Sequence, residues 1–294
     1  MQRFVRRIKA SWLLYPLAAW LAAFVAPVEA ARIAVLSNKN FNETAVYFNQ
    51  KITGHSFTPI DVGSGPPPTL NSLTSNFDAL LLYEDSTFAG STAVGNLVAA
   101  FANTGRPVIL GTFYDQDRTD ADVANTPHGW GTLESIDPNT TDGKGTAYAL
   151  RTLNTSTMAA HPLTAGITSL MSLKFAGGNL AKVGTTVVAY WNELNARNLP
   201  DPAIAYRISG PACVIHVAIA PNYPTIGVAG VDFNGDFNRV WKNAFDYAAT
   251  SCGMAAPAGP VEEVPAQNGP MLAATALLLA ALAWRRLARA SRRH

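Results

Sequence analysis

The first half of the chain alternates between short apolar runs and apolar positions at helical spacing. Runs in which most residues are apolar are typical of strands buried on both faces, and they occupy residues 32–36, 57–62, 77–83 and 106–110. Between them, apolar positions recur as on an amphipathic helix, which predicts helices at residues 41–52, 70–73 and 91–104. Three strand–helix units with short joints predict an α/β domain with an open, mostly parallel sheet and helices on both faces.

Polar residues and glycine at the helix ends support these boundaries. Asn40 and Glu43 have the spacing of a capping box, in which each side chain pairs with a backbone N–H of the first turn. Ser91 or Thr92 is suited to cap the third helix. Gly105 follows that helix, where the chain often needs a positive φ.

The second half is predicted to consist mainly of strands before a closing helix. The strands are expected at residues 148–153, 170–175, 185–191, 204–208 and 213–220. The helix is expected at residues 237–249, with Phe237, Trp241 and Phe245 facing the core. Residues 111–145 show little periodicity, and a stretch of that length is either functional or built from small elements.

The chain has two cysteines, Cys213 and Cys252, and we expect them to form a disulfide. Cys213 begins the last predicted strand, and Cys252 follows the helix that returns from it. Eight strand residues span about 26 Å and thirteen to fifteen helical residues about 20–22 Å, so both sulfurs should reach the same end of the sheet. A bridge that closes a loop of about forty residues stabilises a fold by roughly 3–4 kcal/mol.

Residues 1–30 have the pattern of a cleaved secretory signal. Four basic residues between Arg3 and Lys9 precede an apolar stretch at residues 12–25, and Val28 and Ala30 stand before the expected cleavage point. Export would carry both cysteines to an oxidising compartment, where disulfides persist.

A short apolar segment and a basic tail close the chain. The fourteen residues Met271–Trp284 rise about 21 Å as a helix, which is less than a hydrocarbon core of about 30 Å. Arg285 and Arg286 begin a cluster of five arginines. The positive-inside rule places such a cluster on the cytoplasmic side of the membrane. A Pro/Ala-rich linker at residues 253–269 stands in front. Residues 270–294 therefore indicate a sorting signal more than a permanent membrane span.

The terminal segments hold the surplus positive charge of the chain. The 22 Lys and Arg and 20 Asp and Glu give a net charge of +2, but nine of the basic residues and only three of the acidic ones lie before residue 31 or after residue 252. The body at residues 31–252, which we interpret as one domain, therefore carries a net charge of −4. A mildly acidic body lacks the electrostatic footprint of a nucleic-acid-binding protein, so no nucleic-acid partner is expected.

Val264-Pro265, the apolar segment Met271–Trp284 and Arg285-Arg286 resemble the C-terminal sorting domains of Gram-negative bacteria, the PEP-CTERM and IPTL-CTERM group. The resemblance implies export through the inner membrane, sorting to the cell surface, and an exosortase-like inner-membrane protease or transpeptidase as a partner. Val-Pro-Ala-Gln stands where that group has Val-Pro-Glu-Pro or Ile-Pro-Thr-Leu. The subtype and the cleavage of the tail therefore stay open.

The segment from Arg106 to Asp115 resembles the nucleophile turn of class I glutamine amidotransferases, where a cysteine follows two residues after the glycine that ends the strand. Phe113 occupies that position here, and His216 is followed by Val217 and Ala218 instead of the family's His-x-Glu pair. Residues 77–83, 161–166 and 214–249 are similar to the trehalose-utilisation (ThuA-like) branch of the same flavodoxin-like fold. The resemblance implies the amidotransferase-like fold without its catalytic cysteine, so we assign no catalytic residue and lean against an enzyme.

In a parallel sheet, the residues that follow the strands meet at the carboxyl edge, where open α/β sheets bind ligands. The candidate pocket residues after the third and fourth strands and on two later loops are Glu84, Asp85, Gly111, Thr112, Phe113, Tyr114, Asp115, Trp130, Asn222 and Tyr223. Aromatic rings beside carboxylates and amides suit a glycan or a small polar ligand. This placement is a hypothesis from topology alone.

The remaining polar motifs are interpreted as structural. His161 is expected to form a local turn with Thr164, and His216 to be a hydrogen-bonded core residue, while His55 and His128 have no partner at recognisable spacing. Residues 232–238 resemble a calcium loop, but Phe237 stands where that loop needs glycine, so Asp236 is expected to cap the closing helix. The aspartates at residues 115–122 are interpreted as a solvated loop, and neither a metal nor a cofactor is expected.

Three functions follow as hypotheses. The first is an exported, non-catalytic protein that binds a ligand or a partner at the cell surface. The second is an extracytoplasmic hydrolase acting on carbohydrate, with an acid and a base among Glu84, Asp85, Asp115 and Asp117. The third is a structural component of a surface matrix.

Overall fold

The computed structural model describes residues 30–83, 85, 90–112, 129–141, 149–174, 179–195 and 197–252. All of these residues belong to the first of the two units into which the chain divides, Met1–Gly253 and Met254–His294. The signal segment, the linker, the apolar segment and the sorting residues Val264, Pro265, Arg285 and Arg286 lie outside the described residues. Within the described ranges, no helix is long and apolar enough to cross a membrane.

The elements follow the chain in three groups. The first group is β1 (Ala31–Ser37), α2 (Phe41–Lys51), β2 (His55–Asp61), α3 (Leu70–Asn76), β3 (Ala79–Leu82), α4 (Ser91–Ala102) and β4 (Val108–Gly111). The second group is α5 (Leu133–Ile136), β5 (Asn139–Thr141), β6 (Ala149–Thr152), the 3-10 turn η4 (Pro162–Thr164), β7 (Leu170–Lys174) and β8 (Asn179–Ala181). The third group is β9 (Thr185–Leu194), β10 (Pro200–Ser209), β11 (Ala212–Val217), α6 (Tyr223–Ile226), β12 (Phe233–Gly235) and α7 (Phe237–Thr250).

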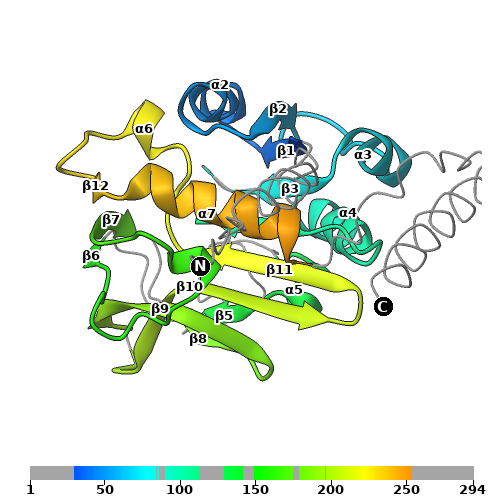
Figure 1. Cartoon of the computed structure of the whole chain (residues 1–294). Helices are drawn as coiled ribbons and strands as arrows, with labels where there is room; N and C mark the ends of the chain where they lie inside the picture. Colours follow the sequence, from blue (N-terminus) through cyan, green and yellow to red (C-terminus); the bar gives the residue numbers. More distant parts are fainter. Residues whose placement is uncertain are drawn as a thin grey trace, which may run out of the picture. The chain divides into compact units, whose positions relative to one another are not determined.

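The main sheet has seven strands in the order β2-β1-β3-β4-β11-β10-β9 (Figure 1). The pairs from β2 through β11 are parallel, and β10 and β9 continue the sheet antiparallel to their neighbours. Two smaller sheets, β12-β7-β6 and β5-β8, complete the described strands. The predicted class, an α/β fold with an open and mostly parallel sheet, is confirmed.

Alternate residues of the central strands enter two separate hydrophobic clusters. Ile33 of β1 packs in the first cluster with Phe48 of α2 and Phe245 of α7. Its neighbour Ala34 packs in the second cluster, with Val98 of α4. Because each strand is covered on both faces, its sequence reads as a continuous apolar run, and the predicted helices on both faces are confirmed.

Among the strand boundaries that differ from the prediction, the starts of β3 and β10 have identifiable reasons. β3 begins at Ala79 and not at residue 77, because α3 continues to Asn76 and Phe77 is its C-cap. β10 begins at Pro200, four residues before the predicted start, and its ladder with β9 is irregular between Pro200 and Ile204. Prolines at positions 200 and 202 weaken the strand signal, since proline cannot donate to a ladder.

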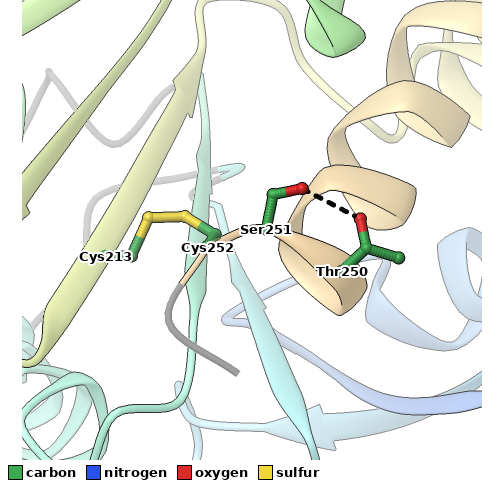
Figure 2. Close-up of a disulfide and its surroundings, with 4 residues drawn as sticks. All are labelled: Cys213, Thr250, Ser251 and Cys252. Carbon is green, nitrogen blue, oxygen red and sulfur yellow. Dashed lines mark hydrogen bonds between the residues drawn. A yellow bond between two sulfur atoms is a disulfide. The ribbon is translucent and has the colours of Figure 1, made fainter. Parts of the chain in front are cut away.

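The expected disulfide between Cys213 and Cys252 is present (Figure 2). Their Cα atoms lie 5.5 Å apart, and both side chains are buried in the first cluster. The bond ties Cys252, two residues after α7, to β11, an inner strand of the sheet. The prediction from strand and helix lengths is confirmed.

Candidate functional site

β1 and β3 are neighbours in the sheet, and the direction in which the chain adds strands reverses between them. Their carboxyl ends therefore flank a topological switch point. From β1 the chain crosses to β2 on one side, and from β3 it crosses to β4 on the other. In open α/β sheets, ligands bind in the crevice outside the strands at such a switch point. The residues after β1, β3, β4 and β11 therefore form the candidate site.

Asp85 lies at this point, held by two asparagines that follow β1. Its backbone N–H donates to Oδ1 of Asn38 at 3.1 Å, and its carboxylate Oδ2 accepts a hydrogen bond from Nδ2 of Asn40. Asn40 has a left-handed backbone, with a φ of 53°, and makes no side-chain cap on α2. The predicted capping box is wrong, because the Asn40 amide turns to Asp85 and leaves the helix end.

Burial raises the pKa of the Asp85 carboxyl above its ordinary value. The amides of Asn40 and Asn222 and the ammonium of Lys39 oppose this shift by favouring the ionised form. Asn222 therefore acts on Asp85 although the two residues come from loops that are far apart in sequence.

Tyr83 fixes the loop that carries these asparagines. Its hydroxyl lies 2.8 Å from Oγ1 of Thr44 and donates to the carbonyl of Lys39 at 3.2 Å. Burial raises the pKa of the Tyr83 phenol well above its usual range, so it stays a neutral donor. The side chain is a support for the site and not a reactive group.

The ends of β4 and β11 complete the cluster. A Cβ on Gly111 would lie 2.9 Å from Cδ of Pro221 and 3.2 Å from the Trp241 ring, so this position admits only glycine. The backbone N–H of the next residue, Thr112, donates to the carbonyl of Ile219 at 3.1 Å and joins the two loops. We call Asn38, Asn40, Asp85, Thr112 and Asn222 the carboxyl-edge cluster.

Two buried side chains of this cluster lack hydrogen-bond partners. Asn222 is wholly buried, and its amide lies near enough to the Asp85 carboxyl to lower that group's pKa, but neither the amide oxygen nor the nitrogen makes a hydrogen bond of good geometry in the described part of the chain. The same is true of the hydroxyl of Thr112, which is 1% exposed. Buried polar groups are nearly always paired, so exceptions need an explanation.

The other predicted pocket residues have different places. Trp130 is fully buried in the second hydrophobic cluster and lies so close to α4 that a Cβ on Gly95 would meet its carbonyl oxygen at 1.9 Å. The hydroxyl of Tyr223 donates to the carbonyl of Leu173 at 2.8 Å, and its ring stacks on Phe233. The remaining candidates lie outside the described residues, namely Glu84, Phe113, Tyr114, Asp115 and Asp117.

The histidines have mainly structural contacts. Nδ1 of His161 accepts from the N–H of Leu163 at 3.2 Å, and Thr164 completes a capping box, which confirms the predicted turn. His216 is buried in β11 with Nδ1 2.8 Å from Nδ2 of Asn139, which confirms a hydrogen-bonded core residue. Nε2 of His55 lies 3.0 Å from Asp246, a partner 191 residues away that spacing in the sequence did not indicate.

Asp236 occupies the N-cap position of α7 but does not cap the helix with its side chain. Its Oδ2 accepts from the backbone N–H of Thr168 at 2.7 Å and of Ser169 at 3.0 Å. These bonds lower the pKa of the Asp236 carboxyl and keep it ionised. The predicted cap is wrong, because the Asp236 side chain bonds this turn and not the first turn of α7.

No group of three or more His, Cys, Asp or Glu that could hold a metal occurs within the described ranges.

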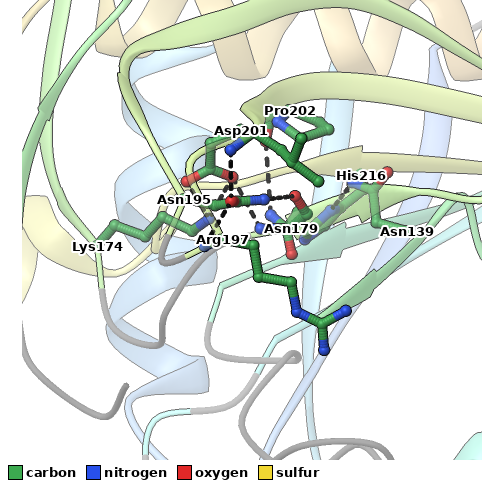
Figure 3. A network of polar contacts seen from close by, with 9 residues as sticks. Asn139, Lys174, Asn179, Asn195, Arg197, Asp201, Pro202 and His216 are labelled. Carbon is green, nitrogen blue, oxygen red and sulfur yellow. Dashed lines mark hydrogen bonds and ion pairs between the residues drawn. The ribbon is translucent and has the colours of Figure 1, made fainter. Parts of the chain in front are cut away.

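A second buried polar region joins β7, β8 and β10 (Figure 3). Nζ of Lys174 lies 3.0 and 3.2 Å from the two carboxylate oxygens of Asp201, and both side chains are fully buried. The N–H of Asn179 donates to Asp201 at 2.8 Å, and the Asn195 amide donates to the carbonyl of Asn179 at 3.1 Å. We call these four residues the lysine–aspartate network. No local pattern in the sequence marks this network, because its partners come from different sheets.

No protein-family model and no curated protein matches this chain. Among solved structures, the carbohydrate deacetylase Agd3 is 13% identical with a TM-score of 0.38, over 65% of this chain and 29% of that one. PurLQS from Thermotoga maritima is 12% identical with a TM-score of 0.44, over 74% and 99%. A glutamine amidotransferase from Thermotoga maritima is 9% identical with a TM-score of 0.42, over 65% and 75%.

This chain spans less than a third of the deacetylase's length. An amidotransferase is thus among the structures that the chain resembles, at low identity. The fold class rests on the strand order of the main sheet.

Proposed function

We propose that this protein is an exported, non-catalytic protein that binds a small polar organic ligand, such as a sugar, in the carboxyl-edge cluster. The observation that carries the proposal is the buried Asn222 amide, which lies near the Asp85 carboxyl and makes no hydrogen bond of good geometry in the described ranges. Leaving a buried polar group unpaired costs about 1–3 kcal/mol. A ligand hydroxyl, which donates and accepts, would pair with both ends of this amide.

The chemistry around Asn222 supports a ligand with several hydroxyl groups. The cluster offers the Asp85 carboxylate as an acceptor and the Thr112 hydroxyl and the asparagine amides as mixed donors and acceptors. It holds a single described carboxylate, and Lys39 is the only described cation that acts on it. Such a set favours a neutral polar molecule over a strongly charged one.

The buried disulfide supports the exported location, because such bonds persist in oxidising compartments. The signal-like N-terminus and the tail from Val264 to Arg286 add sorting to the cell surface of a Gram-negative bacterium. An exosortase-like protease or transpeptidase is then the expected partner at the inner membrane. The mass of the cell-surface form tests this part: loss of the residues after about Val264 supports cleavage, and a full-length C-terminus contradicts it.

A hydrolase remains the second candidate because burial raises the pKa of Asp85. A carboxyl group with a raised pKa suits a general acid. Its expected partner would be Glu84, Asp115 or Asp117. In the first candidate Asp85 holds the ligand, and in the second it transfers a proton, so the two differ in turnover.

The full chain is therefore titrated with a panel of sugars and small polar metabolites, with binding followed by calorimetry and products followed by chromatography. We expect at least one saturable ligand, no turnover, and at least tenfold weaker binding by Asn222→Ala. The control is Asn71→Ala, which removes an exposed amide from α3.

Equal affinity of the Asn222→Ala variant and the wild type would contradict the proposed site. Turnover that Asp85→Asn abolishes would establish the hydrolase in its place.

A further inference from the structure

A groove of about 370 Å³ lies where β6 ends, β7 begins and β12 ends, beside β9. Its polar lining consists of Thr152, Thr155, Thr168, Ser169, Asn192 and Asn234. Its apolar lining consists of Leu153, Leu170 and Met171. None of these residues belongs to the carboxyl-edge cluster. We propose that this hydroxyl groove is a second binding site, which takes a segment of a neutral glycan.

One wall of the groove is built by the motif that resembles a calcium loop. Asn234 and Gly235 line the groove directly. Gly235 has a φ of +81°, and a Cβ there would lie 2.5 Å from the carbonyl oxygen of Ser169. Only glycine lets β12 approach the Thr168–Ser169 turn this closely.

Asp236, from the same motif, holds the neighbouring turn at Thr168 and Ser169 in place. Its Oδ2 accepts from the N–H and the hydroxyl of Thr168, at 2.7 and 2.9 Å, and from the N–H of Ser169 at 3.0 Å. The carboxylate therefore bonds the turn that lines the groove, and the N-terminus of α7 has no side-chain cap from Asp236.

The β9 side of the groove is also held in place. Oε2 of Glu193 accepts from the N–H of Thr152 at 2.9 Å, and the amide of Asn192 donates to the carbonyl of Leu153 at 3.5 Å. The end of β6 and the residue that follows it are thus linked to β9 beside the groove. A site whose walls are fixed before binding loses less conformational entropy when the ligand arrives.

The lining selects a neutral, hydroxyl-rich ligand. It contains four hydroxyl groups and two amides around an apolar floor, and no charged side chain. Sugar rings present hydroxyl groups at the rim and apolar C–H groups on the face, which matches this arrangement. An anionic glycan would find no cation in the lining and would lie near the ionised Asp236. The volume falls within the range of about 300–1,000 Å³ that is common for ligand sites.

The test uses the full chain with maltotetraose, cellotetraose and mannotetraose as neutral probes and tetragalacturonate as the anionic comparison. Binding is measured by calorimetry and by saturation-transfer NMR. Asn192→Trp fills the groove from an exposed position on β9. Thr186→Trp is the matched control, since it is also exposed on β9 and lies about 20 Å along the strand.

We expect saturable binding of at least one neutral tetrasaccharide, a loss of at least tenfold in Asn192→Trp, and no change in Thr186→Trp. Three results overturn the proposal: no binding of any neutral probe, preference for tetragalacturonate, or equal affinity of the Asn192→Trp variant. Binding that is lost in Asn222→Ala but kept in Asn192→Trp also overturns it. That last result would place the sugar in the carboxyl-edge cluster and leave the proposed function intact.

Discussion

The two buried polar regions of this protein differ in how their hydrogen bonds are completed. In the lysine–aspartate network, Asp201 accepts from both Lys174 and Asn179, and Asn195 uses its amide nitrogen and oxygen. In the carboxyl-edge cluster, Asn222 and Thr112 are buried without a partner in the described ranges.

The difference separates a structural role from a binding role. A buried polar network in which each member is paired rigidifies and specifies a fold. Polar groups that are buried but unpaired lower the stability of the empty protein, and they persist where function requires them. The comparison therefore predicts that substitutions in the network cost stability and that substitutions in the cluster cost binding.

The largest effect is expected for Lys174→Met. This substitution leaves the Asp201 carboxylate buried without its main counter-charge, and breaking one partner of a buried ion pair costs about 3–5 kcal/mol. The free energy of unfolding is measured by denaturant titration, with the exposed Lys51→Met on α2 as the control. A loss below about 1 kcal/mol would show that the pair has no structural role.

A smaller loss is expected for Asn195→Ala. The Asn195 oxygen accepts from the N–H groups of Arg197 and Leu199, both at 3.0 Å, and its nitrogen donates to Asn179. Removing it leaves backbone groups of the β9–β10 connection unpaired, which costs about 1–3 kcal/mol. Thermal unfolding measures the loss, and the exposed Asn71→Ala is again the reference. Unchanged stability would contradict the structural role of the network.

The sequence predicted residues of the carboxyl-edge cluster but not the lysine–aspartate network, and the difference has a physical reason. Asp85, Thr112 and Asn222 could be placed together because parallel strands carry the residues after them to one edge of the sheet. Lys174 and Asp201 are 27 residues apart in different sheets, and no periodicity relates them. Long-range polar pairing depends on tertiary packing, which a local pattern does not encode.

The wrong predictions have the same origin. Asn40 and Asp236 both stand at helix starts with the spacing of caps, and in each case a more distant partner takes the side chain. Capping is worth about 1 kcal/mol, so a charge-assisted bond or several bonds to one turn can replace it. Apolar periodicity, by contrast, involves many residues at once, and it predicted β1, α2 and α7 to within two residues.

The smallest effect is expected for Asp85→Asn, which should raise the free energy of unfolding in a pH-dependent way. Burial raises the pKa of Asp85 above its ordinary value of 3.8, so the folded protein binds this proton more tightly than the unfolded chain. The resulting stabilisation is complete below the ordinary pKa and is lost as the pH rises through the raised folded pKa. Asparagine resembles the protonated form. The variant should therefore exceed the wild type in stability at pH 7 by less than about 1 kcal/mol, because Asp85 is only half-buried.

Denaturant titrations of the wild type and Asp85→Asn at pH 3.5 and pH 7 check this expectation. The difference between the two proteins should be close to zero at the lower pH. A variant that is less stable than the wild type at pH 7 would show that the ionised carboxylate stabilises the empty fold, which contradicts the binding role.

The most direct test of the central claim is the free energy of unfolding of Asn222→Ala, measured without and with the ligand found in the panel. Without ligand, we predict a stability equal to or above that of the wild type, because the lost amide is unpaired. With saturating ligand, the wild type should gain more stability than the variant, in proportion to its tighter binding. A loss of about 1–3 kcal/mol in the empty protein, with an equal gain from ligand in both, would show that Asn222 is structural and contradict the account.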